Sequence, residues 1–377
     1  MTYPPSPQQP PYWSAPPVLT PPPPPVVLPQ VPTSYPMFWR TPGNAWWRPV
    51  VVMVVGLVAC IALSFIVVIP AVILDPSAIP PNGDIQMTPA LFLANNLMLA
   101  ALIPLGMMLA WWLLRQRPGY LSSVTGRFRW RWLWTCVLVA VPIWAVSTGV
   151  NLWLGWDQLA LSMQPHTLAM IIIILTTQVF QAAGEEYAFR GVLFRGIASL
   201  IPIEWLGVLL GSVVPAVVFM YIHGASDVWL NASYITFALC ASWLTWRTGG
   251  LEAAVAVHAV NNLFALAIAP FQPLGGIFDR EEGVGSPWML VSMAILVGTT
   301  ALLTWLAQRK GVQVRNDPGR PQPAVVSPGA PPAPGQLPAW WGAHQPGVVH
   351  PPQYRADAPP APQGYPPQPP RPYDGAP

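Results

Sequence analysis

The sequence has 377 residues, of which only 8% are charged, and its formal net charge is +3. An ordinary soluble domain carries about 25% charged residues, so this composition excludes a soluble globular protein of the same size. The small positive charge, with no glycine-rich phosphate loop or CxxC pair in the sequence, gives no indication of a nucleic acid partner.

The two ends of the chain differ in composition from its middle. Of 51 prolines, 16 lie in residues 1–43 and 20 in residues 311–377. These segments lack the apolar periodicity that would let them bury a core. We therefore predict two disordered Pro-rich tails, 1–43 and 311–377, around a membrane domain at 44–310.

The middle of the chain is a series of long apolar runs. A helix needs about 20 mostly apolar residues to cross a bilayer. The sequence predicts an all-α polytopic membrane protein with about eight transmembrane helices, at residues 49–74, 90–114, 130–154, 168–200, 204–224, 228–246, 251–270 and 287–307.

The basic residues between these runs predict the orientation. Arginines precede the first run and flank the connection between the second and third, and Arg309 and Lys310 follow the last run. The alternate connections carry mainly acidic residues, such as Asp75 and Asp157. The positive-inside rule then places both termini in the cytoplasm. Heavy Pro and Trp usage with little Lys is typical of a high-GC bacterium, so we expect the bacterial cell membrane.

Ionisable side chains within the runs gather in three segments. They are Gly184–Gly191 (GEEYAFRG), Phe219–His223 (FMYIH) and His258–Asn262 (HAVNN). Such groups are costly in a bilayer and indicate function by default. By contrast, Arg195, Glu204 and Glu252 lie near predicted span ends, where exposure at the interface explains them.

The helical spacing predicts contacts within these segments. Glu186 and Arg190 are four residues apart and can form an ion pair on one face, while Glu185 points about 100° away. His258 and Asn262 also share a face. Each feature alone has a structural explanation, such as an interhelical hydrogen bond. Two acids, an arginine, two histidines and an asparagine on three spans are better explained by a site.

The three segments resemble the CPBP family of intramembrane proteases, which includes CAAX proteases and bacteriocin-processing proteins. The family pattern is E-E-x-x-x-R, F-x-x-x-H and H-x-x-x-N on successive spans. The chain fills every position, with Glu185, Glu186, Arg190, Phe219, His223, His258 and Asn262. The resemblance covers about 160–270 and implies an endopeptidase acting on membrane-anchored or membrane-embedded protein or peptide substrates.

Amide hydrolysis needs an activated water and a stabilised oxyanion. We expect Glu185, helped by His223, to deprotonate the water, and His258 and Asn262 to face the oxyanion. Arg190 would hold Glu186, and Phe219 is a candidate substrate contact.

Two alternatives stay open from the sequence. Glu185, His223 and His258 are a reasonable zinc set, although the sequence contains no HExxH and the metal-independent scheme is favoured. The second alternative is a non-catalytic membrane scaffold or immunity protein that retains the motif.

Overall fold

A computed structural model describes residues 27–79, 86–274 and 280–318. Within these ranges the chain is helical and contains no strand. The long helices are α1 (Arg48–Leu74), α2 (Pro89–Ala100), α3 (Leu102–Leu114), α5 (Trp130–Leu154), α6 (Thr167–Glu186), α8 (Glu204–His223), α9 (Val228–Thr248), α10 (Glu252–Ala265) and α12 (Met289–Arg309). The short elements are η1 (Tyr35–Met37), η2 (Pro76–Ala78), α4 (Gly119–Ser122), η3 (Trp156–Gln158), the π-helix η4 (Tyr187–Phe194), α7 (Arg195–Leu200) and η5 (Ala269–Phe271).

The predicted membrane spans correspond closely to these helices. Among the described residues, seven helical segments are long and apolar enough to cross a membrane. The remaining predicted span, 228–246, is present as α9, which has 21 residues. It is not among the seven because polar residues such as Asn231, Ser242 and Thr245 lower its hydropathy. It nevertheless packs against α8, α10 and α12 as part of the bundle.

Three of the spans are not single α-helices. The second is divided into α2 and α3 at Ala101, because Pro104 has no N–H to donate to the carbonyl of Ala100. The fourth runs from Thr167 to Leu200 through α6, the π-helix η4 and α7. The seventh, Glu252–Phe271, consists of α10 and the 3-10 helix η5.

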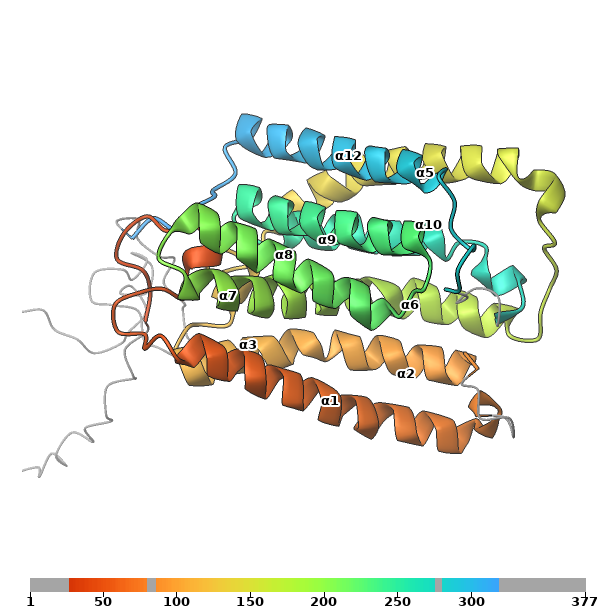
Figure 1. The fold of residues 1–377 in the computed structure, drawn as a ribbon, viewed down its shortest axis with the longest axis horizontal. Coiled ribbons are helices and arrows are strands. Elements are labelled where there is room, and N and C mark those ends of the chain that lie inside the picture. The colour runs from red at the N-terminus through yellow and green to blue at the C-terminus, as the bar shows by residue number, and fades with distance from the viewer. Residues whose placement is uncertain (1–26, 80–85, 275–279, 319–377) are drawn as a thin grey trace, which may run out of the picture. The chain divides into compact units, whose positions relative to one another are not determined.

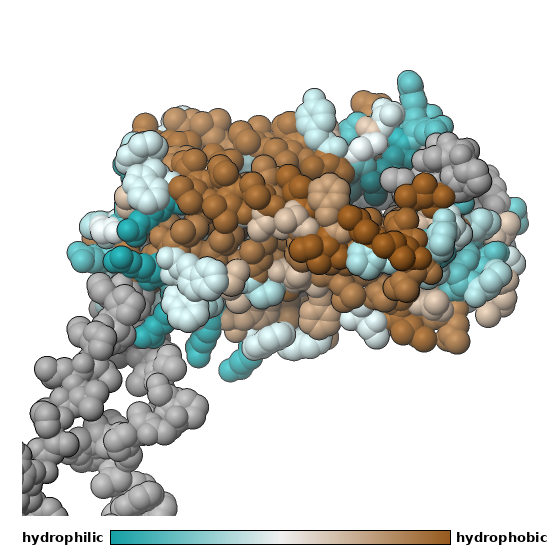
Figure 2. Space-filling view, turned by 90° about the horizontal axis from the view of Figure 1, so that it is seen from below, coloured by the Kyte–Doolittle hydropathy of each residue, from teal (hydrophilic) through white to brown (hydrophobic). Residues whose placement is uncertain are grey.

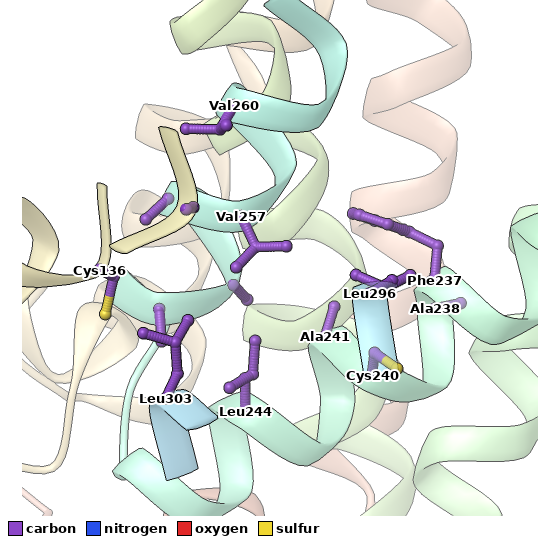
Figure 3. Close-up of a cluster of buried hydrophobic side chains, with 14 of the residues drawn as sticks. Cys136, Phe237, Ala238, Cys240, Ala241, Leu244, Val257, Val260, Leu296 and Leu303 are labelled. Atoms are coloured by element: carbon purple, nitrogen blue, oxygen red, sulfur yellow. The ribbon is translucent and has the colours of Figure 1, made fainter. Parts of the chain in front are cut away.

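The helices pack side by side in layers (Figure 1). α1 packs on α2 and α3, α2 packs on α6, and α10 lies between α6 and α5. The largest buried cluster lies where α5, α9, α10 and α12 meet, with Cys136, Leu244, Val257 and Leu303 pointing into it (Figure 3).

The outer surface is apolar in the way that a lipid-facing surface requires. Large side chains of α1 are exposed, including Leu57 at 61% and Ile66 at 67%. Figure 2 shows a broad apolar face, with hydrophilic residues gathered toward its ends. This distribution is expected of an integral membrane protein, whose helices meet lipid rather than water.

The N-terminal tail does not fit its predicted boundary. Most of the predicted tails lie outside the described residues, but within 27–43 the side chains of Tyr35, Phe38 and Trp39 are buried against the bundle. They enclose Arg195, which is also buried and whose guanidinium carbon lies 3.6 Å from the Tyr35 ring centroid. Arg195 is therefore not the interfacial residue that its position predicted. The aromatic residues are attracted to its charge and shield it from water.

The chain enters and leaves the bundle at the same end. Asn316, after α12, accepts a hydrogen bond from the backbone N–H of Thr33 at 2.6 Å and donates its own backbone N–H to the Thr33 carbonyl at 3.1 Å. The start of α1, at Arg48, and the end of α3, just before Arg115, lie at this end as well (Figure 1).

Candidate functional site

The acidic pair lies at the end of α6, immediately before the π-helix. Glu185 and Glu186 are buried, with 8% and 0% of their surfaces exposed. A π-helix is rare and is frequently found at functional sites. Arg190 lies within it, four residues after Glu186, and its Nη1 donates to Glu186 Oε1 at 3.0 Å. The predicted ion pair is confirmed.

Gly184 allows the backbone of α6 to approach α2 next to these acids. A Cβ atom at this position would lie 1.8 Å from the carbonyl oxygen of Leu99. Only glycine permits this approach, so Gly184 sets the position of Glu185 relative to α2.

His258 of α10 lies between the two carboxylates. Its Nδ1 is 2.7 Å from Glu186 Oε1 and its Nε2 is 3.5 Å from Glu185 Oε2. The sequence predicted that these three residues meet, but it did not predict that one imidazole faces both acids. The imidazole is 3% exposed and its ring packs edge-on against Phe237 of α9 at 4.6 Å.

Arg190 is enclosed by aromatic rings and by the α9 backbone. Its guanidinium carbon lies 5.4 to 5.9 Å from the ring centroids of Phe189, Phe219 and Phe237. Its Nη2 donates to the carbonyl oxygen of Ala238 at 3.0 Å. This cation therefore joins α6, α8 and α9 around Glu186 and balances its charge in the interior.

His223 lies at the end of α8 and is only half-buried. Its Nδ1 is 2.6 Å from the carbonyl oxygen of Phe219, one turn earlier, and its ring packs on Tyr234 at 4.2 Å. Phe219 contacts both histidines, with its ring centroid 4.3 Å from His223 and 6.3 Å from His258. His223 thus joins the site through an aromatic ring, whereas His258 contacts the acids themselves.

Asn262 lies one turn beyond His258 and faces an unpredicted partner. Its Nδ2 donates to Gln181 Oε1 at 3.1 Å, and the Gln181 Nε2 donates to Glu185 Oε1 at 2.5 Å. Gln181 was not among the predicted site residues. The signal was present in the sequence, because Gln178, Gln181 and Glu185 follow a 3,4 spacing on one face of an apolar helix.

Glu252 anchors the helix that carries His258 and Asn262. It was predicted to be interfacial, but it is fully buried and its Oε2 lies 2.6 Å from the Nη2 of Arg129. A second bond joins its Oε1 to the Arg129 Nε at 2.9 Å, so the pair is bidentate. Such a pair fixes the start of α10 against the start of α5.

The zinc set that the sequence left open as an alternative is not assembled in the part of the chain that the structure describes. Among the described residues, no group of three or more His, Cys, Asp or Glu side chains could hold a metal ion. The ring nitrogens of His258 face the two glutamates, and the Nδ1 of His223 faces a backbone carbonyl. The arrangement of Glu185, His223 and His258 therefore does not fit zinc, and we derive no step through a metal.

Comparison with known proteins shows what the segment that carries the site is similar to. Residues 165–264 match the model of the Rce1-like proteins, described as type II CAAX prenyl endopeptidase Rce1-like. An uncharacterized protein of Bacillus subtilis (strain 168), YyaK, is 29% identical over 115 residues, which cover 27% of this chain and 36% of YyaK. No solved structure matches the chain. The matched segment contains every residue of the three motifs.

Proposed function

We propose that the chain is an intramembrane endopeptidase, because residues 165–264 match the model of the Rce1-like type II CAAX prenyl endopeptidases. Its substrates are membrane-anchored or membrane-embedded proteins or peptides, in CAAX-type processing or in peptide maturation. The observation that carries the proposal is the imidazole of His258 between the carboxylates of Glu185 and Glu186. The matched segment, residues 165–264, is about a quarter of the 377-residue chain. The activity of the whole protein is therefore a proposal, and the geometry of this site is what supports it.

In this scheme the site shares one proton. Glu186 Oε1 accepts a hydrogen bond from Arg190, and the His258 Nδ1, which faces the same oxygen, carries a hydrogen and donates it. The Nε2 of the same ring then faces Glu185 Oε2, and two bare acceptors would repel each other. One proton shared between Glu185 and His258 resolves this conflict. It also leaves the four side chains with zero total charge, as an apolar interior favours.

This proton arrangement supports hydrolysis by an activated water. Glu185 takes a proton from the water as its oxygen attacks the carbonyl carbon of the scissile bond. The protonated Nε2–H of His258 and the remaining Nδ2 hydrogen of Asn262 donate to the oxyanion that forms. When the C–N bond breaks, the proton held by Glu185 passes to the leaving amine. Glu186 and Arg190 hold the imidazole in place throughout.

His223 has a supporting part in this scheme. Its Nδ1 donates to the Phe219 carbonyl, so its Nε2 keeps a lone pair that can accept a hydrogen bond from water or substrate. Phe219 lies between the two histidines and offers an apolar contact to the substrate chain.

The activity can be tested with purified protein in detergent. A fluorogenic CAAX-type peptide and a library of membrane peptides serve as substrates for wild type, Glu185→Gln, His223→Ala and His258→Ala, each with and without a zinc chelator. Loss of the acid–base group should lower the cleavage rate by about 10²- to 10⁴-fold. His166→Gln is the matched control, because that histidine contacts the Gln272 carbonyl away from the acids.

The results of these assays distinguish a metal-independent protease, a metal-dependent protease and a non-catalytic scaffold. Cleavage that disappears in Glu185→Gln and His258→Ala, remains in His166→Gln and survives chelation supports the metal-independent scheme. Cleavage lost on chelation contradicts that scheme. Full activity of Glu185→Gln contradicts the proposed site and favours a scaffold that retains the motif.

We further propose that the arginine-rich end of the bundle lies in the cytoplasm of a bacterial cell, with both ends of the chain there. The common exit of residues 33 and 316 at that end supports this orientation. A fluorescent-protein fusion at the C-terminus should then fluoresce, and a periplasm-dependent phosphatase fusion should be inactive. The reverse pattern would refute the orientation.

A further inference from the structure

A chain of buried amide side chains leads from the acid pair to α2. Asn96 donates its Nδ2 to Gln178 Oε1 at 3.1 Å, and the Gln178 Nε2 donates to Gln181 Oε1 at 2.6 Å. The Gln181 Nε2 then donates to Glu185 Oε1 at 2.5 Å. All four side chains are at most 8% exposed. Asn96 lies outside the segment that matches the family model.

The network orients the Gln181 amide. Its oxygen receives two donors, the Nδ2 of Asn262 and the Nε2 of Gln178. An amide rotated by 180° would place its own hydrogens against those donors and would leave Oε1 of Glu185 without the hydrogen bond from Gln181. The neighbours therefore hold the nitrogen end of Gln181 toward the carboxylate.

This bond determines which oxygen of Glu185 is available. Oε1 is taken by Gln181, so Oε2 is the oxygen that faces the Nε2 of His258. Rotation of the carboxylate would break a short buried hydrogen bond, which is costly where water cannot replace it.

We infer that Gln181 is a positioning residue for Glu185, and that Gln178 and Asn96 hold Gln181 in turn. The inference rests on the proposed function for its catalytic meaning. It extends the site from the matched segment onto α2, through side chains that do not touch the reacting atoms. The donated hydrogen bond holds the carboxylate in one orientation, with Oε2 left to accept the proton from water.

The test uses Gln181→Met, which keeps the length of the side chain but removes the donor. N,N′-dicyclohexylcarbodiimide reacts with protonated carboxyl groups in apolar surroundings and needs no substrate. Labelling of the purified full-length chain is followed by mass spectrometry across a pH series, separately at Glu185 and Glu186. Asn96→Leu is a second variant, remote from the acids. Thr304→Val is the control, since it removes one interhelical hydrogen bond, to Trp243, far from the site.

We expect Gln181→Met to move the labelling midpoint at Glu185 to higher pH, because the carboxylate loses the hydrogen bond from the Gln181 Nε2. A smaller shift in the same direction is expected for Asn96→Leu. Glu186 should keep its midpoint in both variants, and Thr304→Val should match wild type at both positions. Cleavage assays should show the acidic limb of the kcat profile moving with the labelling midpoint and KM unchanged.

Equal Glu185 midpoints in wild type and both variants would overturn the inference, whatever the cleavage assay shows. Equal shifts at Glu185 and Glu186 would also overturn it, because a general loosening of the bundle would explain them. A wild type that cleaves nothing contradicts the proposed function, while the labelling result still decides whether Gln181 controls Glu185.

Discussion

Gly184→Ala should disable the site without touching any ionisable group. Gly184 precedes Glu185 where α6 meets α2, and an added Cβ would lie 1.8 Å from the Leu99 carbonyl oxygen and 2.5 Å from its carbon. Ordinary van der Waals contact begins at 3.4 Å, so the two backbones must separate locally by about 1.6 Å (3.4 − 1.8). The obstacle is backbone, which cannot rotate away as a side chain could.

The displacement is large compared with the tolerance of a catalytic site. A misplacement of about 1 Å can cost about 100-fold in rate, so we expect at least this loss of cleavage. Overpacking typically costs about 1–3 kcal/mol of folding free energy, partly offset by about 1 kcal/mol from the better helix propensity of alanine. The unfolding temperature in detergent should therefore fall modestly while activity falls strongly.

Gly298→Ala in α12 is the matched control, because a Cβ there meets nothing within 4 Å. It should keep full activity and equal or slightly exceed the wild-type unfolding temperature. Equal behaviour of Gly184→Ala and Gly298→Ala in both the cleavage and the thermal assay would refute this role of Gly184.

Three other predictions concern stability, measured by thermal unfolding in detergent. Arg129→Ala breaks the buried ion pair with Glu252 and should lower the free energy of unfolding by about 3–5 kcal/mol. Arg315→Ala breaks the more exposed ion pair with Glu204 and should lower it by about 0–1 kcal/mol. Similar losses of stability in the two variants would contradict this prediction. Phe38→Ala should lower the free energy of unfolding by about 3–5 kcal/mol because the Phe38 ring is fully buried. Trp46→Ala should change it little because the Trp46 side chain is 76% exposed. An unchanged stability of Phe38→Ala would refute the packing of the N-terminal segment on the bundle. Asp227 caps α9 through the backbone N–H groups of residues 229 and 230, which lower its pKa. The ionised Asp227 carboxylate therefore stabilises the folded protein above about pH 4, and this stabilisation is lost as the pH falls further. Asp227→Asn should remove that part of the acid dependence of the unfolding temperature.

The span positions and the ion pair followed from the sequence because they depend on local features. Long apolar runs can satisfy their backbone groups only as helices in lipid, so the predicted spans agree with the helices within a few residues. The pairing of Glu186 with Arg190 depends on a four-residue spacing within one segment. The linked motifs also indicated the family before any geometry was available.

The rest depended on contacts between segments far apart in the chain. Whether Arg195 and Glu252 meet water or partners was decided by Tyr35 and Arg129, which lie 160 and 123 residues away. The position of His258 between two acids required α10 to pack on α6, and the amide chain required α2 to pack there as well. Hydropathy describes how each helix meets lipid, but it does not say which helices are neighbours. In this protein tertiary packing therefore decided which polar groups meet, whereas the sequence alone determined which ones need partners.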